Sequence, residues 1–177
     1  MKALGQIVQS CSALKAEAAS EIWVTHVLAN PSLYPALELA EHLVSLPAEV
    51  LADPQCGAVR MLNHAAPTLR KALAKGPRED GNWSMATTAN CRCRHCQSAA
   101  EFVRSDSQVE GVFPLAEQYR DHVREQLAGL DLPLAFEVRK QGSPYKLVIT
   151  KHAILFAQDA HRFARLKACC ETLEQRG

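Results

Sequence analysis

Apolar residues recur at three- and four-residue spacing through the first 75 residues, which predicts a series of short helices. One apolar stripe covers residues 4–14, and a second apolar segment covers residues 22–29 before Asn30-Pro31. Proline stops a helix because it lacks a backbone donor, so residues 32–44 are expected to form a separate helix capped by Ser32. Such short helices favour antiparallel hairpins, either as a small bundle or as a fragment of a helical-repeat array.

The next start signal is Asp53-Pro54, where Asp is a plausible N-cap and Pro suits the first helical turn. The apolar positions that follow extend to Leu73, and the helix is expected to end near Gly76. Pro67 lies inside this stretch, so we expect it to kink the helix or to split it in two.

Residues 76–89 lack any hydrophobic period and are predicted to be a linker, in which Trp83 packs against one of the two domains. The linker separates a helical domain, residues 1–75, from a second domain, residues 90–177. In the second domain the pattern predicts a helix over 114–127, strands over 134–140 and 145–150 joined by a turn, and a helix over 153–175. The expected fold class is therefore mainly α, with helical hairpins followed by a small α+β module.

The composition is that of an ordinary globular protein, with 47% hydrophobic, 22% charged and only 6% aromatic residues. No apolar run approaches the roughly 18 residues that a membrane-spanning helix needs, and the first residues do not resemble a signal peptide. We therefore expect a cytoplasmic or otherwise intracellular protein without a membrane partner. The net charge of +1 combines −4 over residues 1–58 with +5 over the remainder, which is a modest basic tilt.

Three of the seven cysteines fall within six residues, as Cys91, Cys93 and Cys96. In a reducing compartment such cysteines are more often metal ligands than disulfides. The Cys93-x-x-Cys96 spacing is typical of a metal-binding turn, and the neighbouring Arg92 and Arg94 favour the thiolate form that binds metal. The pattern predicts a structural Zn²⁺ site, which requires a fourth ligand.

The strongest candidate for the fourth ligand is His122, because it lies on the predicted helix that follows the cluster. His95 lies between two of the cysteines, where its ring is expected to point away. The candidates that stay open besides these two are His152, His161 and the pair Cys169-Cys170.

Other interpretations of the cluster are less favoured on chemical grounds. An iron–sulfur cluster prefers a fourth cysteine and another spacing, and a redox Cys-x-x-Cys lacks the expected βαβ surroundings. A catalytic zinc lacks a nearby general base in a His-x-Glu context. Three unligated thiols are the simplest alternative.

The predicted hairpin is rich in cations that could follow a nucleic-acid backbone or bind another anion. The candidate contact residues are Arg139, Lys140, Lys146 and Lys151 on the hairpin, joined by Arg92 and Arg94 in the cysteine turn. Lysines also protect exposed strand edges from aggregation, and this interpretation is the more favoured of the two.

The second half also resembles an uncharacterised zinc-binding C-terminal region of large fungal and some bacterial proteins, several with an Fe(II)/2-oxoglutarate oxygenase-like domain upstream. The residues that carry the resemblance are Cys91-x-Cys93-x-x-Cys96, Phe102-Val103, Phe113-Pro114, Tyr119-Arg120-x-His122 and Gly142-Ser143-Pro144-Tyr145-x-Leu147-Val148-x-Thr150-Lys151. It implies His122 as the fourth ligand and a module at the end of a longer protein, but no established activity. The chain has no His-x-Asp pair, so the oxygenase iron site is not expected here.

Together these patterns predict a non-catalytic, zinc-stabilised module that binds a partner protein or a nucleic acid, with no small-molecule substrate. The alternative is an accessory or regulatory C-terminal domain of an oxygenase-like enzyme whose catalytic part lies outside this chain.

Overall fold

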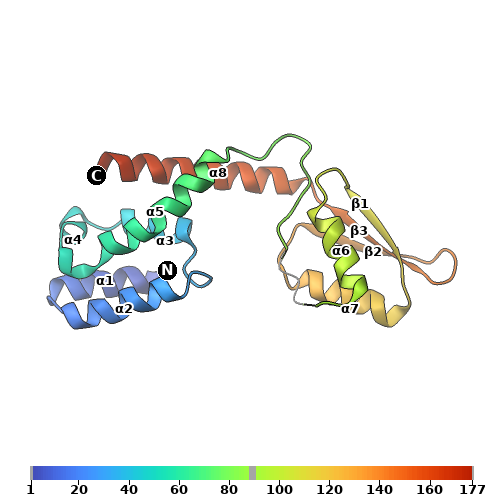
Figure 1. The fold of residues 1–177 in the computed structure, drawn as a ribbon, viewed down its shortest axis with the longest axis horizontal. Helices are drawn as coiled ribbons and strands as arrows, with labels where there is room; N and C mark the ends of the chain where they lie inside the picture. The colour runs from blue at the N-terminus through green and yellow to red at the C-terminus, as the bar shows by residue number, and fades with distance from the viewer. Residues whose placement is uncertain (1, 88–90, 177) are drawn as a thin grey trace. The chain divides into compact units, whose positions relative to one another are not determined.

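The computed structural model describes residues 2–87 and 91–176, and it confirms the predicted fold class, mainly α with a small β part (Figure 1). Over these residues the chain forms eight α-helices, one 3-10 turn and three strands. The chain divides into two compact units. The helical unit comprises Met1–Pro77 together with His161–Gly177, and the sheet unit comprises Arg78–Ala160.

The helical unit is built from short helices whose apolar faces pack together. Its elements are α1 (Lys2–Ala13), α2 (Glu17–Ala29), α3 (Ala36–Val44), α4 (Ala48–Leu51), the 3-10 turn η1 (Pro54–Cys56), α5 (Ala58–Ala74) and the C-terminal part of α8 (Ile154–Arg176). One hydrophobic cluster includes the fully buried Leu43 and Met61, and a second joins Leu69 of α5 to Leu166 of α8.

The start of α3 differs from the prediction, because this helix begins at Ala36 and not after Ser32. Pro35 disfavours helical geometry at the residue before it, so residues 31–34 form turns in which the Leu33 and Tyr34 amides donate to the Asn30 carbonyl.

Asp53 caps η1 as expected, since its side chain accepts a hydrogen bond from the Gln55 amide at 2.9 Å. The turn ends at Gly57, whose φ of +72° suits glycine, and α5 starts immediately afterwards. Pro67 does not split α5, which runs through it as one helix.

The sheet unit contains α6 (Arg94–Arg104), β1 (Glu110–Pro114), α7 (Glu117–Ala128), β2 (Leu134–Arg139), β3 (Lys146–Lys151) and the first residues of α8. The strands form an antiparallel sheet in the order β1-β3-β2, with β3 in the centre. Residues that face one another across the sheet, such as Phe113, Leu147 and Val138, share one side. The core of this unit includes Leu147 and Ile149 from the sheet and Val123 from α7.

Helix α6 and strand β1 are additions to the predicted elements. The polar residues at the start of α6 conceal its buried stripe, which consists of Cys96, Ala99, Ala100, Phe102 and Val103. Strand β1 contains both Gly111 and Pro114, which weaken any strand signal. Glycine is required at 111 because a Cβ there would lie 2.8 Å from ring carbons of Phe102 and Phe113.

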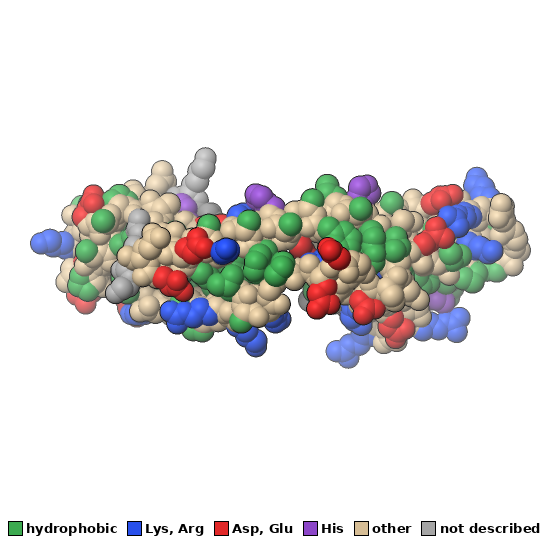
Figure 2. Space-filling model, turned by 90° about the horizontal axis from the view of Figure 1, so that it is seen from above, with side chains coloured by type: hydrophobic (Ala, Val, Ile, Leu, Met, Phe, Trp, Pro, Cys, Tyr) green, Lys and Arg blue, Asp and Glu red, His purple; other side chains and the backbone are tan. Residues whose placement is uncertain are grey.

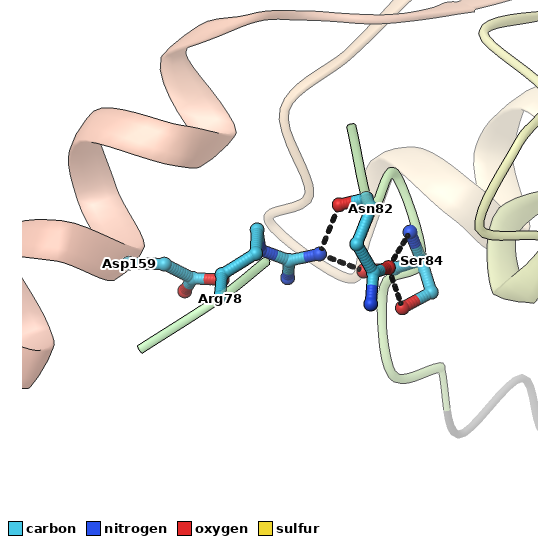
Figure 3. A network of polar contacts seen from close by, with 4 residues as sticks. All are labelled: Arg78, Asn82, Ser84 and Asp159. Atoms are coloured by element: carbon cyan, nitrogen blue, oxygen red, sulfur yellow. Dashed lines mark hydrogen bonds and ion pairs between the residues drawn. The ribbon is translucent and has the colours of Figure 1, made fainter. Parts of the chain in front are cut away.

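The predicted linker is partly an ordered segment of the sheet unit. The Arg78 guanidinium donates to the backbone carbonyls of Asn82 and Ser84, at 2.7 Å each, and pairs with Asp159 of α8 (Figure 3). Trp83 packs edge-to-face on Phe156 with ring centroids 4.9 Å apart, so it lies against one unit as expected. Residues 88–90 of the predicted linker lie outside the described residues.

The end of the chain groups differently from the ranges expected from the sequence, which placed residues 161–177 with the α+β module. In the structure these residues belong to the helical unit. Cys169 and Cys170 of α8 are buried in a cluster with residues of α3 and α5, and Arg165 forms an ion pair with Glu41 of α3. Apolar packing therefore assigns this half of α8 to the helical unit.

Candidate metal centre

The cysteine cluster occupies the entrance to α6. Cys93 is the N-cap residue, with extended backbone angles, and its Sγ accepts a hydrogen bond from the Cys96 amide at 3.4 Å. Cys96 lies in the first turn of the helix, and Cys91 precedes the cap by two residues. A helix N-terminus favours negative charge because its amides are free to donate, so this position suits thiolates.

Helix α7 brings His122 to the cysteines. The His122 Nε2 atom lies 3.2 Å from the Cys91 Sγ atom, and the four donor atoms all lie within 4.8 Å of one another. Donors of a tetrahedral zinc–sulfur site are separated by about 3.5–4 Å, given metal–ligand bonds of about 2.0–2.3 Å. Cys91, Cys93, Cys96 and His122 are therefore close enough to bind one metal ion.

Arg120, two residues before His122, fixes the position of α7. It is only 8% exposed, and its guanidinium donates to the Leu115 carbonyl at 2.7 Å. The same group lies over the Tyr145 ring, 5.6 Å from the centroid, while the Tyr145 carbonyl accepts from the Leu115 amide. Sequence reasoning assigned no role to Arg120. The available signal was a charged residue close to the ligand on the helix.

His95 lies outside the ligand set, as expected. Its ring packs on the Tyr119 ring of α7 with centroids 4.6 Å apart and planes tilted by 41°, so it joins α6 to α7 by another route. Among the described residues, the three cysteines and His122 form the only group of Cys, His, Asp and Glu side chains that could hold a metal ion.

The remaining candidates for the fourth ligand make other contacts or belong to the helical unit. The His152 Nδ1 atom accepts from the Ile154 amide at the start of α8. His161 belongs to the helical unit, and Cys169 and Cys170 are buried in the core of that unit.

The cysteines differ in their electrostatic environment. The hydrogen bond from the Cys96 amide lowers the pKa of the Cys93 thiol to about 6. Burial raises the pKa of the Cys96 thiol to about 12, because the charged form would lose its hydration. A coordinated cation deprotonates a thiol directly and supplies the missing counter-charge. A buried thiol beside two half-buried ones and an imidazole therefore fits a metal ion.

Two of the six proposed anion contacts have structural roles instead. Lys151 is 2% exposed, and its Nζ donates to the Ser105 carbonyl at 2.6 Å and lies 4.8 Å from the centroid of the Phe102 ring. Arg139 pairs with both carboxylate oxygens of Glu110, at 2.8 and 3.2 Å. Both side chains are therefore committed to the fold of the sheet unit.

The register explains why Arg139 has this role. Arg139 of β2 faces Lys146 of β3, whereas Glu110 of β1 faces Thr150. The ion pair therefore crosses the central strand diagonally over Val148. Val148 is only 1% exposed, whereas Val112, which faces it on β1, is 46% exposed. The long side chain of Arg139 thus helps to cover the outer face of the sheet.

The other predicted contacts are more accessible. Arg92, Arg94 and Lys140 are exposed, and Lys146 is half-buried. On the face seen in Figure 2, Lys and Arg side chains are interspersed with Asp and Glu and do not form one continuous field. The sheet unit as a whole has ten Lys and Arg against eleven Asp and Glu, so the basic excess of the second half lies outside it.

Two further findings extend beyond the metal centre. In the described ranges, no helix combines the length and the apolar character that crossing a bilayer requires. No protein-family model, no curated protein and no solved structure matches the chain. The resemblance of the second half to a zinc-binding C-terminal region therefore stays a prediction.

Proposed function

We propose that the sheet unit is a non-catalytic interaction module stabilised by a structural Zn²⁺ ion, with Cys91, Cys93, Cys96 and His122 as its ligands. The observation that supports this proposal most directly is the convergence of three sulfurs and one imidazole nitrogen within 4.8 Å. These donors come from the α6 entrance and from α7, which are separated by a strand in the sequence.

The donor set favours zinc over other metals. Thiolate and imidazole ligands suit Zn²⁺, whereas Mg²⁺ and Ca²⁺ prefer oxygen ligands. Iron–sulfur clusters usually take four cysteines, and here the fourth residue is histidine. Four protein ligands also complete a tetrahedral site and leave no open position for substrate, which favours a structural role.

The packing of the sheet unit indicates which structural role the ion would have. Helix α7 buries Arg120, Val123 and Leu127, so it offers only two buried apolar side chains to the core. A metal bonded to His122 and to the α6 cysteines would join the two helices where apolar packing is thin. Small domains commonly use a metal in this way.

Metal analysis of the purified chain tests the proposal. We expect one zinc per chain by elemental analysis, and loss of that zinc in the His122→Ala and Cys93→Ser variants. His95→Ala is the matched histidine control and Cys11→Ser, in the helical unit, is the cysteine control, and both should keep the metal. Absence of stoichiometric zinc from the parent would overturn the proposal, and retention in His122→Ala would overturn the ligand set.

We propose a protein as the partner of this module, ahead of a nucleic acid. The near balance of charge in the sheet unit, and the structural roles of Arg139 and Lys151, support this choice. Non-specific nucleic-acid binding depends on many unpaired cations and weakens steeply with salt. A titration of fluorescent single- and double-stranded oligonucleotides at low salt should therefore show no saturable binding. Tight, salt-sensitive binding would instead establish the nucleic-acid target.

A further inference from the structure

The helical unit contains a cavity that is independent of the metal centre. It lies between α2, α3 and α5 and has a volume of about 210 Å³. Its lining draws on both hydrophobic clusters of the unit, since Val27 and Leu39 belong to one and Ala65 to the other. The small side chains of Ala36 and Ala65 leave space between α3 and α5 that a larger residue would fill.

One wall of the cavity is aromatic and held in place. The Tyr34 ring lines the cavity and packs edge-to-face on His26, with centroids 5.8 Å apart and planes at 81°. His26 in turn packs edge-to-face on Trp23, at 5.8 Å and 85°. Edge-to-face chains of this kind orient each ring, so Tyr34 presents a defined aromatic surface to a guest.

The polar groups of the lining are few. His64 and Thr68 lie one turn apart on α5 and both line the cavity, and Tyr34 adds a phenol. None of the lining residues is Lys, Arg, Asp or Glu. The cavity therefore has no carboxylate, ammonium or guanidinium group to pair with an ion, but it can form one or two hydrogen bonds with a mainly apolar guest.

The volume limits the size of the guest. An engineered apolar cavity of about 150 Å³ accepts benzene, whereas sites for larger ligands usually exceed about 300 Å³. We propose that this cavity binds a neutral aromatic ring with one hydrogen-bonding group, of the size of a phenol or an indole. Such a ring is supplied by a small molecule or by a Tyr or Trp side chain of a partner protein.

The probes p-cresol and indole test this directly, because they are the Tyr and Trp side chains as free molecules. Each is titrated into the full chain while backbone amides are followed by NMR. We expect saturable shifts confined to α2, α3 and α5, with a Kd of about 1 mM or tighter. Ala36→Leu and Thr68→Met, which fill the cavity, should weaken binding at least tenfold, whereas Ala72→Leu, at an exposed position of α5 outside the lining, should not.

Shifts that do not saturate, or binding that is equally tight in Ala36→Leu and Thr68→Met, would overturn the proposal. N-acetyl-tyrosinamide and N-acetyl-tryptophanamide then distinguish the two sources. Binding as tight as that of the free ring indicates a side chain of a partner, and loss of binding with the blocked backbone indicates a free small molecule. Chelator-treated protein should bind the rings with the same Kd, which separates this cavity from the metal centre.

Discussion

The two units differ in what holds their helices. In the helical unit, α3 buries Leu37, Leu39, Ala40 and Leu43, and α5 buries four apolar or small residues against it. In the sheet unit, α7 has 12 residues but only Val123 and Leu127 as buried apolar side chains. Ordering a backbone costs about 1–2 kcal/mol per residue, whereas burying one large apolar side chain contributes about 1.5–3 kcal/mol. Helix α7 therefore depends more on specific bonds than α3 and α5 do, although the sheet unit has an apolar core of its own.

The specific bonds of α7 lie around the candidate metal ligands. Arg120 ties α7 to Tyr145, His95 and Tyr119 pack across α6 and α7, and His122 meets the cysteines. The comparison shows that α3 and α5 are held mainly by buried apolar area, whereas α7 combines less apolar area with a few directional contacts. We expect these two kinds of stabilisation to respond differently to the same treatment.

Removal of the metal with a chelator is expected to have the largest effect. Structural zinc contributes about 10–16 kcal/mol of apparent binding free energy in zinc-finger peptides, which exceeds the contribution of any one side chain. Amide hydrogen exchange should show that α6 and α7 lose protection while α3 and α5 keep theirs. Equal loss in both units would mean that they unfold as one, and no loss in α6 and α7 would contradict the structural role of the metal.

The converse experiment is Leu43→Ala in the helical unit. Leu43 is fully buried, so its truncation should lower the free energy of unfolding of that unit by about 2–5 kcal/mol. The zinc content should stay unchanged, because no ligand lies in this unit. Denaturant unfolding and elemental analysis check both points. Leu14→Ala, at a position 77% exposed, is the matched control and should change stability by less than about 0.5 kcal/mol.

A smaller effect is expected from two glycines of the sheet unit. Gly111→Ala would place a Cβ 2.8 Å from ring carbons of Phe102 and Phe113, and such overpacking costs about 1–3 kcal/mol. Gly129→Ala is the control, because its nearest atom would be 3.6 Å away and its backbone is helical. That variant should be neutral or more stable by up to about 1 kcal/mol. Thermal unfolding of both variants tests whether the sheet core is as tightly packed as the structure shows.

The sequence predicted most helices and the cysteine cluster, but it did not predict the contacts between distant residues. The helices of the helical unit were largely predictable because its apolar residues repeat at helical spacing. Cys91, Cys93 and Cys96 were evident because ligand spacing is a local property, and His122 followed from its place on the next helix. Residues whose roles depend on distant partners were not predictable: Lys151 reaches Ser105, and Arg139 reaches Glu110 across a third strand. Strand β1 was missed because Gly111 and Pro114 weaken its strand signal, and the need for glycine at 111 depends in part on the distant Phe102 ring.

The smallest effect concerns Asp53, which joins the cap of η1 to α1. Its carboxylate accepts hydrogen bonds from the Ser12 hydroxyl at 2.6 Å and from the Gln55 amide at 2.9 Å, and these bonds lower its pKa. A lowered pKa means that the charged form stabilises the fold. That contribution is complete above the ordinary Asp pKa of about 3.9 and is lost as the pH falls through the lower pKa of the folded state.

Asp53→Asn keeps an acceptor for Gln55 but removes the charge, so it separates the ionic part of this contact from its geometry. We expect the variant to be slightly less stable than the parent at pH 7, and this difference should vanish at the acid end of a titration. The Gln55 amide resonance reports the ionisation directly, and it lies in the helical unit, which contains none of the candidate metal ligands. A difference in stability that stays constant across the titration would show that the cap acts through shape alone. The helical unit would then owe its stability to packing with no ionic contribution at this cap, which sharpens the contrast with the sheet unit and its proposed structural metal.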